Sequence, residues 1–171
     1  MNIILIGMRG SGKTTVGRLL SQKLRFTFLE TDSKIENLVG STIAEFVTKE
    51  RWKSFRKIET TVIQSLKNRK ECVISTGGGV ILKKKNVEIL KNLGMIFFLH
   101  APVTLLIQRI GNDRTRPFLT VAKTREEDIK KTLSHRLHLY RKIAHYVISV
   151  SGKTPNTVAS EIIERIEKYN E

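Results

Sequence analysis

The segment from Gly7 to Thr14 reads GMRGSGKT and matches the phosphate-binding pattern G-x-x-x-x-G-K-[ST]. It lies between an apolar run of strand length and a helical pattern, which is the context that this pattern requires. Glycines let successive backbone N–H groups turn toward phosphate oxygens, and the following helix presents its positive end to the same anion. We expect Lys13 to reach the β- and γ-phosphates and the Thr14 hydroxyl to bind Mg²⁺. The sequence therefore predicts a nucleoside triphosphate site, made of Gly10, Ser11, Gly12, Lys13, Thr14 and Thr15.

Other sequence features indicate which class of nucleotide-binding protein this is. A GTPase would carry the base-reading motif Asn-Lys-x-Asp, which this sequence lacks. A motor or AAA-type ATPase would have an apolar strand that ends in adjacent acids, whereas here the run 72–74 continues into Ser75 and Thr76. A small kinase remains, and it needs an acceptor site, a group that handles a hydroxyl proton and a lid against water.

Three consecutive glycines follow the apolar run 72–74, within the stretch STGGGV at 75–80. Glycine loses the most backbone freedom on folding, so three glycines at a strand end require a cause. Either the chain makes an awkward turn there, or another group approaches the backbone more closely than a Cβ would allow.

Two acids, Glu30 and Asp32, stand at the carboxyl end of the second predicted strand, 27–30. In a parallel α/β sheet, ligands bind at that edge. Because residues i and i+2 share one face of a strand, we expect the two carboxylates to point the same way. The alternative for Asp32 is the N-cap of a helix that begins at Ser33.

Two arginines lie on apolar helical faces. Arg136 follows the helical spacing of Ile129 and Tyr140, and Arg56 lies in a similar stripe, three residues before Glu59. Arginine is rarely buried unless an anion pairs with it. An internal ion pair is one explanation, and a bidentate clamp on a substrate carboxylate is the other. Two such arginines together with a glycine run favour the clamp.

The stretch 111–123, GNDRTRPFLTVAK, has no periodic pattern and is a candidate mobile lid. A loop arginine brought over the phosphates, such as Arg114 or Arg116, could stabilise charge that develops on a transferred phosphoryl group. The alternative for each of them is a solvated surface side chain.

These residues need a scaffold in which strands and helices alternate. The sequence predicts strands at 2–6, 27–30, 72–75, 95–99 and 146–150. It predicts helices at 13–24, 42–67 with an interruption near Arg51, 87–93, 103–109, 125–144 and from Pro155 onward. Strands that are apolar throughout and alternate with helices indicate a parallel sheet covered on both faces.

Length and composition limit the number of domains, the partners and the compartment that we expect. A chain of 171 residues fits one domain, and 31 Lys and Arg against 16 Asp and Glu give a formal net charge of +15. The basic residues are scattered and aromatic residues make up 6%, so no basic stripe with interleaved aromatics is present and we expect no nucleic-acid partner. The single cysteine, Cys72, excludes an internal disulfide and fits a reducing compartment. No apolar run is long enough to span a bilayer, so we expect a cytoplasmic protein without a membrane partner.

Together, these motifs resemble those of the shikimate kinase family. The matching segments are GMRGSGKTT at 7–15, TD at 31–32, FRKIE at 55–59, STGGG at 75–79, RTRPFL at 114–119 and HRLHLYR at 135–141. The resemblance covers nearly the whole chain and extends to KTP at 153–155. It implies ATP- and Mg²⁺-dependent phosphorylation of the 3-hydroxyl of shikimate, in the route to chorismate and the aromatic amino acids.

The resemblance also implies a fold. This is a three-layer α/β/α P-loop NTPase fold with a five-stranded parallel sheet, flanking helices and a mobile lid. The range 1–171 would form a single kinase domain, with a substrate-binding helical segment at about 32–60 and the lid at about 111–123. We expect a monomer whose partners are the small molecules shikimate and ATP.

Residue roles follow from the same resemblance. Asp32 would hold the shikimate hydroxyls and assist deprotonation of the attacking one, and Arg56 and Arg136 would bind the carboxylate. The glycine run would let the substrate ring approach bare backbone, and the lid arginine would contact the phosphates. The remaining assignments are Gly77, Gly78 and Gly79 for the glycine run, Arg116 for the lid arginine, Arg109, Lys153 and Pro155 around the adenine, and Ser75 near the Mg²⁺ water shell.

One position departs from the family pattern. The family usually has Asp-x-Asp where this chain has Glu30-Thr31-Asp32, which moves the first carboxylate outward by one methylene. If that acid contacts Mg²⁺ through water, the longer side chain works by shifting the water. Two alternatives stay open: a kinase of another small acceptor, such as gluconate or a nucleotide, and a basic nucleic-acid-binding protein with a regulatory phosphate loop. The paired arginines favour a carboxylated alcohol as the acceptor.

Overall fold

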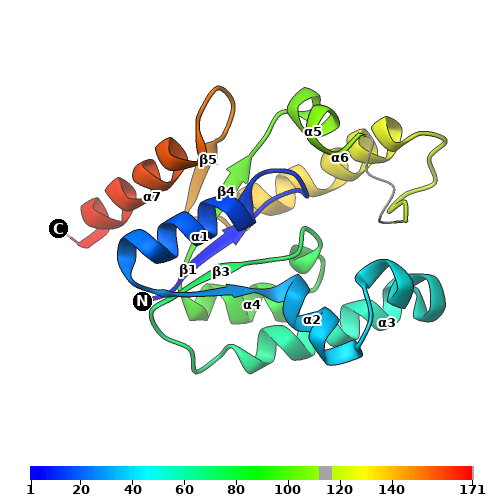
Figure 1. The fold of residues 1–171 in the computed structure, drawn as a ribbon, viewed down its shortest axis with the longest axis horizontal. Coiled ribbons are helices and arrows are strands. Elements are labelled where there is room, and N and C mark those ends of the chain that lie inside the picture. Colours follow the sequence, from blue (N-terminus) through cyan, green and yellow to red (C-terminus); the bar gives the residue numbers. More distant parts are fainter. Residues whose placement is uncertain (112–116, 171) are drawn as a thin grey trace.

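A five-stranded, fully parallel sheet forms the centre of the computed structural model, which describes residues 1–111 and 117–170 (Figure 1). The spatial order of the strands is β2-β3-β1-β4-β5. Their bounds are β1 Ile3–Ile6, β2 Thr27–Glu30, β3 Cys72–Ser75, β4 Met95–His100 and β5 Tyr146–Ser149. The predicted parallel sheet is confirmed, and each strand lies within one residue of its predicted bounds.

Helices cover both faces of this sheet, as predicted. Helices α1 (Lys13–Leu24) and α7 (Pro155–Asn170) pack side by side on one face, while α4 (Lys84–Leu93) and α6 (Arg125–Ile143) contact β4 from the other face (Figure 1). The remaining helices are α2 (Thr31–Val39), α3 (Ile43–Ser65), α5 (Val103–Ile110) and the 3₁₀ turn η1 (Val80–Leu82). In the described part of the chain, no helix combines the length and apolar character needed to cross a membrane.

The structure agrees with several local predictions and corrects others. The predicted break near Arg51 is confirmed, because this residue has φ 69° and ψ 160° inside α3. Helix α4 begins at Lys84, three residues before its predicted start. Helix α2 entered the predictions only as the alternative in which Asp32 caps a helix that begins at Ser33, because its sequence TDSKIENLV is short and largely polar. Its apolar residues Ile35, Leu38 and Val39 have helical spacing but span little more than one turn, which is too short for a firm helical pattern.

Two groups of buried apolar side chains stabilise the fold. The larger group surrounds β1, whose four residues are all fully buried between β3 and β4. The smaller group lies between α2 and α3 and consists of Ile35, Ile43, Val47, Phe55 and Val62. The α2–α3 segment, which protrudes beside the sheet in Figure 1, therefore has a small apolar core of its own.

The Asn2 side chain connects three segments at the amino end of β1. Its amide nitrogen donates to the carbonyls of Arg69 and Leu93, at 2.7 and 2.9 Å, and its amide oxygen accepts from the N–H of Cys72 at 3.0 Å. Asn2 is 3% exposed, so water cannot replace these partners without rearrangement. One buried amide thus fixes the start of β3 against the end of α4.

We predict that Asn2→Ala lowers the free energy of unfolding by about 2 to 4 kcal/mol, because three backbone groups lose their buried partner. Urea denaturation measures the effect as a lower midpoint at an unchanged m-value. Asn68→Ala is the matched control, since Asn68 is exposed in the nearby turn and should change little. Equal midpoints for Asn2→Ala and wild type would contradict this account.

Candidate active site

The phosphate-binding loop joins the carboxyl end of β1 to the start of α1. Gly12 precedes the helix with φ 92° and ψ 11°, a left-handed conformation that favours glycine, and no side chain caps the helix there. The first N–H groups of α1 have no partner within the helix and point toward the loop. This arrangement suits a phosphate group and agrees with the sequence pattern.

The Lys13 side chain lies along the loop and is buried. Its ammonium group donates to the carbonyl oxygens of Gly7 at 3.0 Å and Met8 at 2.9 Å. These two carbonyls hold the charged end of the side chain over the concave face of the loop, where phosphate oxygens would bind.

Glu30 lies beside the threonine that was predicted to bind the metal. The Thr14 hydroxyl donates to the Glu30 carboxylate, and the Ser33 hydroxyl donates to the same carboxylate at 3.0 Å. A hydroxyl and a carboxylate oxygen are thus adjacent at the start of α1. Mg²⁺ prefers such oxygen ligands.

A pocket surrounds these groups. Its lining residues are Arg9, Gly10, Gly12, Lys13, Thr14, Thr15, Glu30, Asp32, Ser33, Glu36, Ser75, Thr76, Gly77 and Gly78. Most of the residues predicted for ATP and Mg²⁺ are therefore brought together. Ser11 differs, because its side chain is buried behind the loop near Gly7 and does not line the pocket. Any contact of Ser11 with phosphate would come from its backbone.

A second cavity adjoins the first. It is lined by Asp32, Arg56, Glu59, Gly77, Gly78, Gly79 and Arg136, with an apolar wall that includes Ile43, Trp52 and Phe55. Asp32, Gly77 and Gly78 line both spaces. The structure therefore confirms that the two arginines and the glycine run converge on one pocket beside the phosphate site.

The chain turns at the glycine run, where the Val80 N–H donates to the Gly77 carbonyl at 3.2 Å, but the backbone angles of this turn do not require glycine. Positive φ angles occur at other glycines, but at none of residues 77–79. A Cβ on Gly77 would lie 2.6 Å from Asp32 Oδ1, and a Cβ on Gly79 would overlap the Arg56 guanidinium. A Cβ on Gly78 would be 3.6 Å from Arg136 Nη1. At Gly77 and Gly79, the groups that need the bare backbone in this structure are the charged side chains of Asp32 and Arg56.

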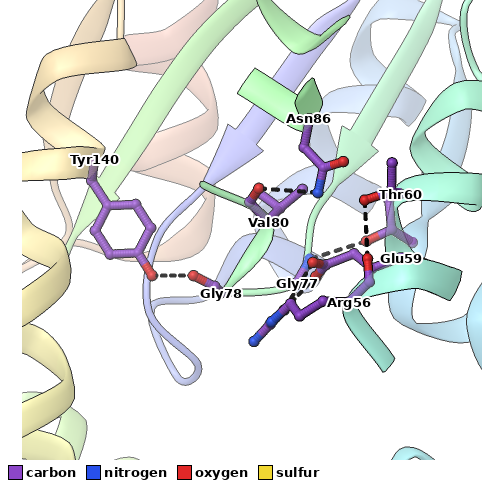
Figure 2. Close-up of polar contacts among 9 residues, drawn as sticks. Arg56, Glu59, Thr60, Gly77, Gly78, Val80, Asn86 and Tyr140 are labelled. Atoms are coloured by element: carbon purple, nitrogen blue, oxygen red, sulfur yellow. Dashed lines mark hydrogen bonds and ion pairs between the residues drawn. The ribbon is translucent and has the colours of Figure 1, made fainter. Parts of the chain in front are cut away.

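Arg56 and Glu59 form an ion pair at the edge of the cavity (Figure 2). Arg56 Nη1 donates to both carboxylate oxygens at 2.8 Å, and the guanidinium lies 5.4 and 5.0 Å from the ring centroids of Trp52 and Phe55. Burial raises the pKa of the Glu59 carboxyl, and the adjacent Arg56 opposes that shift. The two explanations offered for Arg56 are thus compatible, because an internal ion pair orients an arginine that also lines the cavity.

Helix α6 places Arg136 on the opposite side of the same cavity. Arg136 is 8% exposed and shares the inward face of α6 with Ile129, Thr132 and Tyr140, all of which are buried. The predicted inward stripe is confirmed. Its polar members, Thr132 and Arg136, line the cavity.

Asp32 lies at the predicted edge of the sheet, but the reason predicted for its position is wrong. Strand β2 ends at Glu30 and α2 begins at Thr31, so Glu30 and Asp32 do not share a strand face. The capping alternative is wrong as well, because the N-cap of α2 is Glu30 and Asp32 lies within the first helical turn. Both acids nevertheless line the phosphate pocket, since the strand end and the helix start meet at the same edge of the sheet.

Two of the residues predicted around the adenine, Arg109 and Pro155, lie beside the phosphate loop or the start of α1. Arg109 of α5 donates to the Gly10 carbonyl at 2.9 Å. Pro155 begins α7 and lines a shallow hollow with Thr14 and Thr15. Lys153 lies just before α7 and forms an ion pair with Glu161 at 2.5 Å. Ser75 is buried at the end of β3 and lines the phosphate pocket.

The two lid arginines, Arg114 and Arg116, lie outside the described residues, so their predicted positions stay predictions. The chain that follows them is attached to α6. Asp128 accepts from the N–H groups of Leu119 and Thr120, at 3.0 and 2.7 Å, and from the Thr120 hydroxyl at 2.8 Å. Sequence reasoning missed Asp128, because an acid in the first turn of a helix is expected for its favourable interaction with the helix dipole alone.

Comparisons with known proteins agree with this geometry. The family model described as Shikimate kinase matches residues 9–167. A shikimate kinase from Thermodesulfovibrio yellowstonii is 41% identical over 169 residues, which cover 99% of this chain and 96% of that protein. A shikimate kinase from Acinetobacter baumannii is 41% identical over 165 residues, which cover 96% of this chain and 91% of that protein.

Solved structures give the same result. The shikimate kinase from Acinetobacter baumannii in complex with shikimate superposes with a TM-score of 0.93 at 39% identity, covering 98% of this chain and 93% of that one. The shikimate kinase from Aquifex aeolicus gives a TM-score of 0.86 at 31% identity, with 99% and 98% covered. The predicted fold is confirmed, and the chain belongs to the shikimate kinase family.

Proposed function

We propose that this kinase transfers the γ-phosphoryl group of ATP to the 3-hydroxyl of shikimate. The observation that carries the proposal is the junction of two pockets at Asp32, Gly77 and Gly78, one formed around the phosphate loop and the other closed by Arg56 and Arg136. The related Acinetobacter baumannii kinase was solved in complex with shikimate, which supports the same acceptor here.

The acceptor cavity has the chemistry that a carboxylated, hydroxylated ring requires. Arg56 and Arg136 would bind the carboxylate, because guanidinium groups form paired, charge-assisted hydrogen bonds with carboxylates. Trp52 and Phe55 supply apolar surface for the ring. Asp32 lies at the side that faces the phosphate loop, so we assign it the hydroxyl that attacks, and we assign the bare backbone at residues 77–79 to the ring.

Magnesium fits the oxygen atoms around Thr14. The Thr14 hydroxyl and the Glu30 carboxylate are hydrogen-bonded to each other, and Ser75 lines the same pocket. We propose Thr14 as the direct ligand, with Glu30 and Ser75 acting through water. A bound Mg²⁺ would supply positive charge to the β- and γ-phosphates. The described residues contain no cluster of three His, Cys, Asp or Glu side chains that could hold a metal, and Mg²⁺ in kinases takes much of its coordination from phosphate and water.

Positioning and electrostatics would account for most of the catalysis. Lys13 would neutralise charge on the transferred group, and Asp32 would align the acceptor hydroxyl and take part in removing its proton. Arg116 is proposed as the lid arginine that contacts the phosphates. Arg109, Lys153 and Pro155 are proposed as the border of the adenine.

The α2–α3 segment corresponds to the substrate-binding segment predicted at about 32–60. Its separate apolar core supports the proposal that it moves as a unit relative to the sheet. We further propose that residues 1–171 form one kinase domain. The N-terminus of α3 is tied to α2 by Glu36, whose carboxylate accepts from the Ile43 N–H at 3.0 Å, so the two helices would move together.

We predict that ATP consumption depends on shikimate. A coupled assay with purified protein, ATP and Mg²⁺ should show rapid ADP release only when shikimate is added, because the acceptor hydroxyl must occupy the junction of the two pockets. Gluconate and nucleoside monophosphates serve as competing acceptors. Equal rates with and without shikimate, or preference for one of the other acceptors, would refute the proposed function.

We predict that Lys13→Ala and Asp32→Asn lower kcat by at least about 100-fold, since each removes a group placed at the reacting phosphate or hydroxyl. Steady-state kinetics with saturating shikimate measure the loss. Lys23→Ala is the control for Lys13→Ala, because Lys23 is exposed in the last turn of the same helix. A variant at either site that kept near wild-type turnover would remove that residue from the mechanism.

We predict that Arg56→Ala and Arg136→Ala raise the KM for shikimate by about 10- to 100-fold and leave the KM for ATP nearly unchanged, because hydrogen bonds to charged groups contribute about 1.5–3 kcal/mol. Arg136→Lys should recover only part of the loss, since lysine cannot form the bidentate pair. Calorimetric titration with shikimate provides an independent measure. A parallel rise in both Michaelis constants would instead indicate general damage to the site.

A further inference from the structure

We propose that Tyr140 is a positioning residue for acceptor binding, because its phenol holds the backbone of Gly78 beside the carboxylate-binding Arg136. This inference rests on the proposed function, in which Arg136 and the glycine run bind the acceptor. Tyr140 does not line the cavity itself, so it acts through the two groups that do.

The phenol adjoins both groups that it would orient. Its hydroxyl donates to the Gly78 carbonyl oxygen at 2.5 Å, and Figure 2 shows the side chain extending from its helix straight to that carbonyl. The Arg136 guanidinium lies next to the same backbone, because a Cβ on Gly78 would be 3.5 Å from the Tyr140 hydroxyl oxygen and 3.6 Å from Arg136 Nη1. The phenol thus holds the Gly78 carbonyl and also borders the space that the guanidinium occupies.

The surrounding core holds the Tyr140 ring rigidly, so the position of its hydroxyl is well defined. Tyr140 is fully buried, and its ring stacks on Phe98 of β4 with centroids 4.9 Å apart and an interplanar angle of 19°. Phe98 is itself buried in the central sheet. Because the ring cannot shift without disturbing the core, the position of the hydroxyl is fixed by the sheet and not by solvent.

The hydrogen bond to Gly78 fixes the middle carbonyl of the glycine run. The carbonyls of Gly77 and Gly79 accept from the N–H groups of Val80 and Leu82, at 3.2 and 3.0 Å, whereas that of Gly78 accepts from Tyr140. A peptide unit is planar, so fixing the Gly78 carbonyl also fixes the N–H of Gly79. Glycine would otherwise allow this unit to rotate more freely than other residues do. Side chains hold the flanking positions: the Gly77 N–H donates to Thr31 Oγ1 at 3.0 Å. Asn86 Nδ2 donates to the Val80 carbonyl at 3.2 Å (Figure 2). Between them, the contact at Gly78 comes from Tyr140.

The phenol stays neutral and can donate throughout the working range of pH. Burial raises the pKa of Tyr140 to about 12, and the positive charge of Arg136 only partly opposes that rise. Since the protonated form dominates below the pKa, the hydroxyl donates at neutral pH. Loss of the hydroxyl should therefore have the same effect at pH 6 as at pH 9.

A second tyrosine provides a matched control. Tyr146 of β5 stacks on Phe97, the residue before Phe98, with centroids 5.4 Å apart and an interplanar angle of 20°. It thus makes a similar ring contact with the same strand, but it lines neither the acceptor cavity nor the phosphate pocket. If the ring alone matters, Tyr140→Phe and Tyr146→Phe should behave alike.

The experiment compares these two variants with wild type in steady-state kinetics. We expect Tyr140→Phe to raise the KM for shikimate by about 3- to 10-fold, the range for loss of one net hydrogen bond, with an unchanged KM for ATP and no dependence of the ratio on pH between about 6 and 9. Tyr146→Phe should match wild type in both constants. Calorimetric titration with shikimate should reproduce the difference as weaker binding.

A double-mutant cycle with Arg136→Ala tests the proposed connection. If Tyr140 acts through Arg136, Tyr140→Phe should weaken shikimate binding much less in the Arg136→Ala background than in wild type. An unchanged KM for shikimate in Tyr140→Phe, an equal rise in both Michaelis constants, or full additivity in the cycle would overturn the inference. Wild-type protein that does not phosphorylate shikimate would overturn the proposed function, and this inference with it, before any variant is compared.

Discussion

The close packing of charged side chains against main chain without Cβ atoms is the constraint on which the site depends. Asp32 and Arg56 arrive from two helices and lie where a Cβ on Gly77 or Gly79 would overlap them, while Arg136 from a third helix would be in contact with a Cβ on Gly78. A larger residue at Gly77 or Gly79 would push one of the charged groups aside. The glycine run therefore sets the width of the acceptor pocket, and the cost in backbone freedom is accepted at the place where binding requires it.

Sheet topology explains why donor and acceptor groups meet. The strand order places β1, β3 and β2 side by side, and all strands end at the same edge because they are parallel. The loop after β1 binds phosphate, the segment after β3 is the glycine run, and the chain after β2 carries Glu30 and Asp32. Three segments that lie about 25 to 70 residues apart in the chain thus become neighbours, at the edge where ligands bind in such sheets.

The sequence was sufficient for the parts of this site that depend on local pattern. Apolar runs revealed every strand, and helical spacing placed Arg136 and Arg56 on inward faces. It failed where the outcome depends on tertiary contacts. The start of α2 one residue after β2 changed the geometry of Asp32, and nothing in TDSKIENLV signals that boundary. The hydrogen bonds from the 119–120 backbone to Asp128 join residues 9 and 8 positions apart, and the one from Tyr140 to Gly78 joins residues 62 positions apart. Periodicity cannot reveal such contacts.

Contacts within the protein also explain how several cationic side chains can be held in one site before an anionic ligand binds. Arg56 is paired with Glu59 and Lys13 with two loop carbonyls, while Arg136 is buried beside Gly78 and Tyr140. Each cation is held by the surrounding protein, so side-chain ordering is largely complete in the free protein. Binding then loses less conformational entropy than it would with loose surface arginines and lysines. Folding therefore places the binding groups before the ligand arrives, and residues such as Glu59 and Tyr140 hold those groups in position.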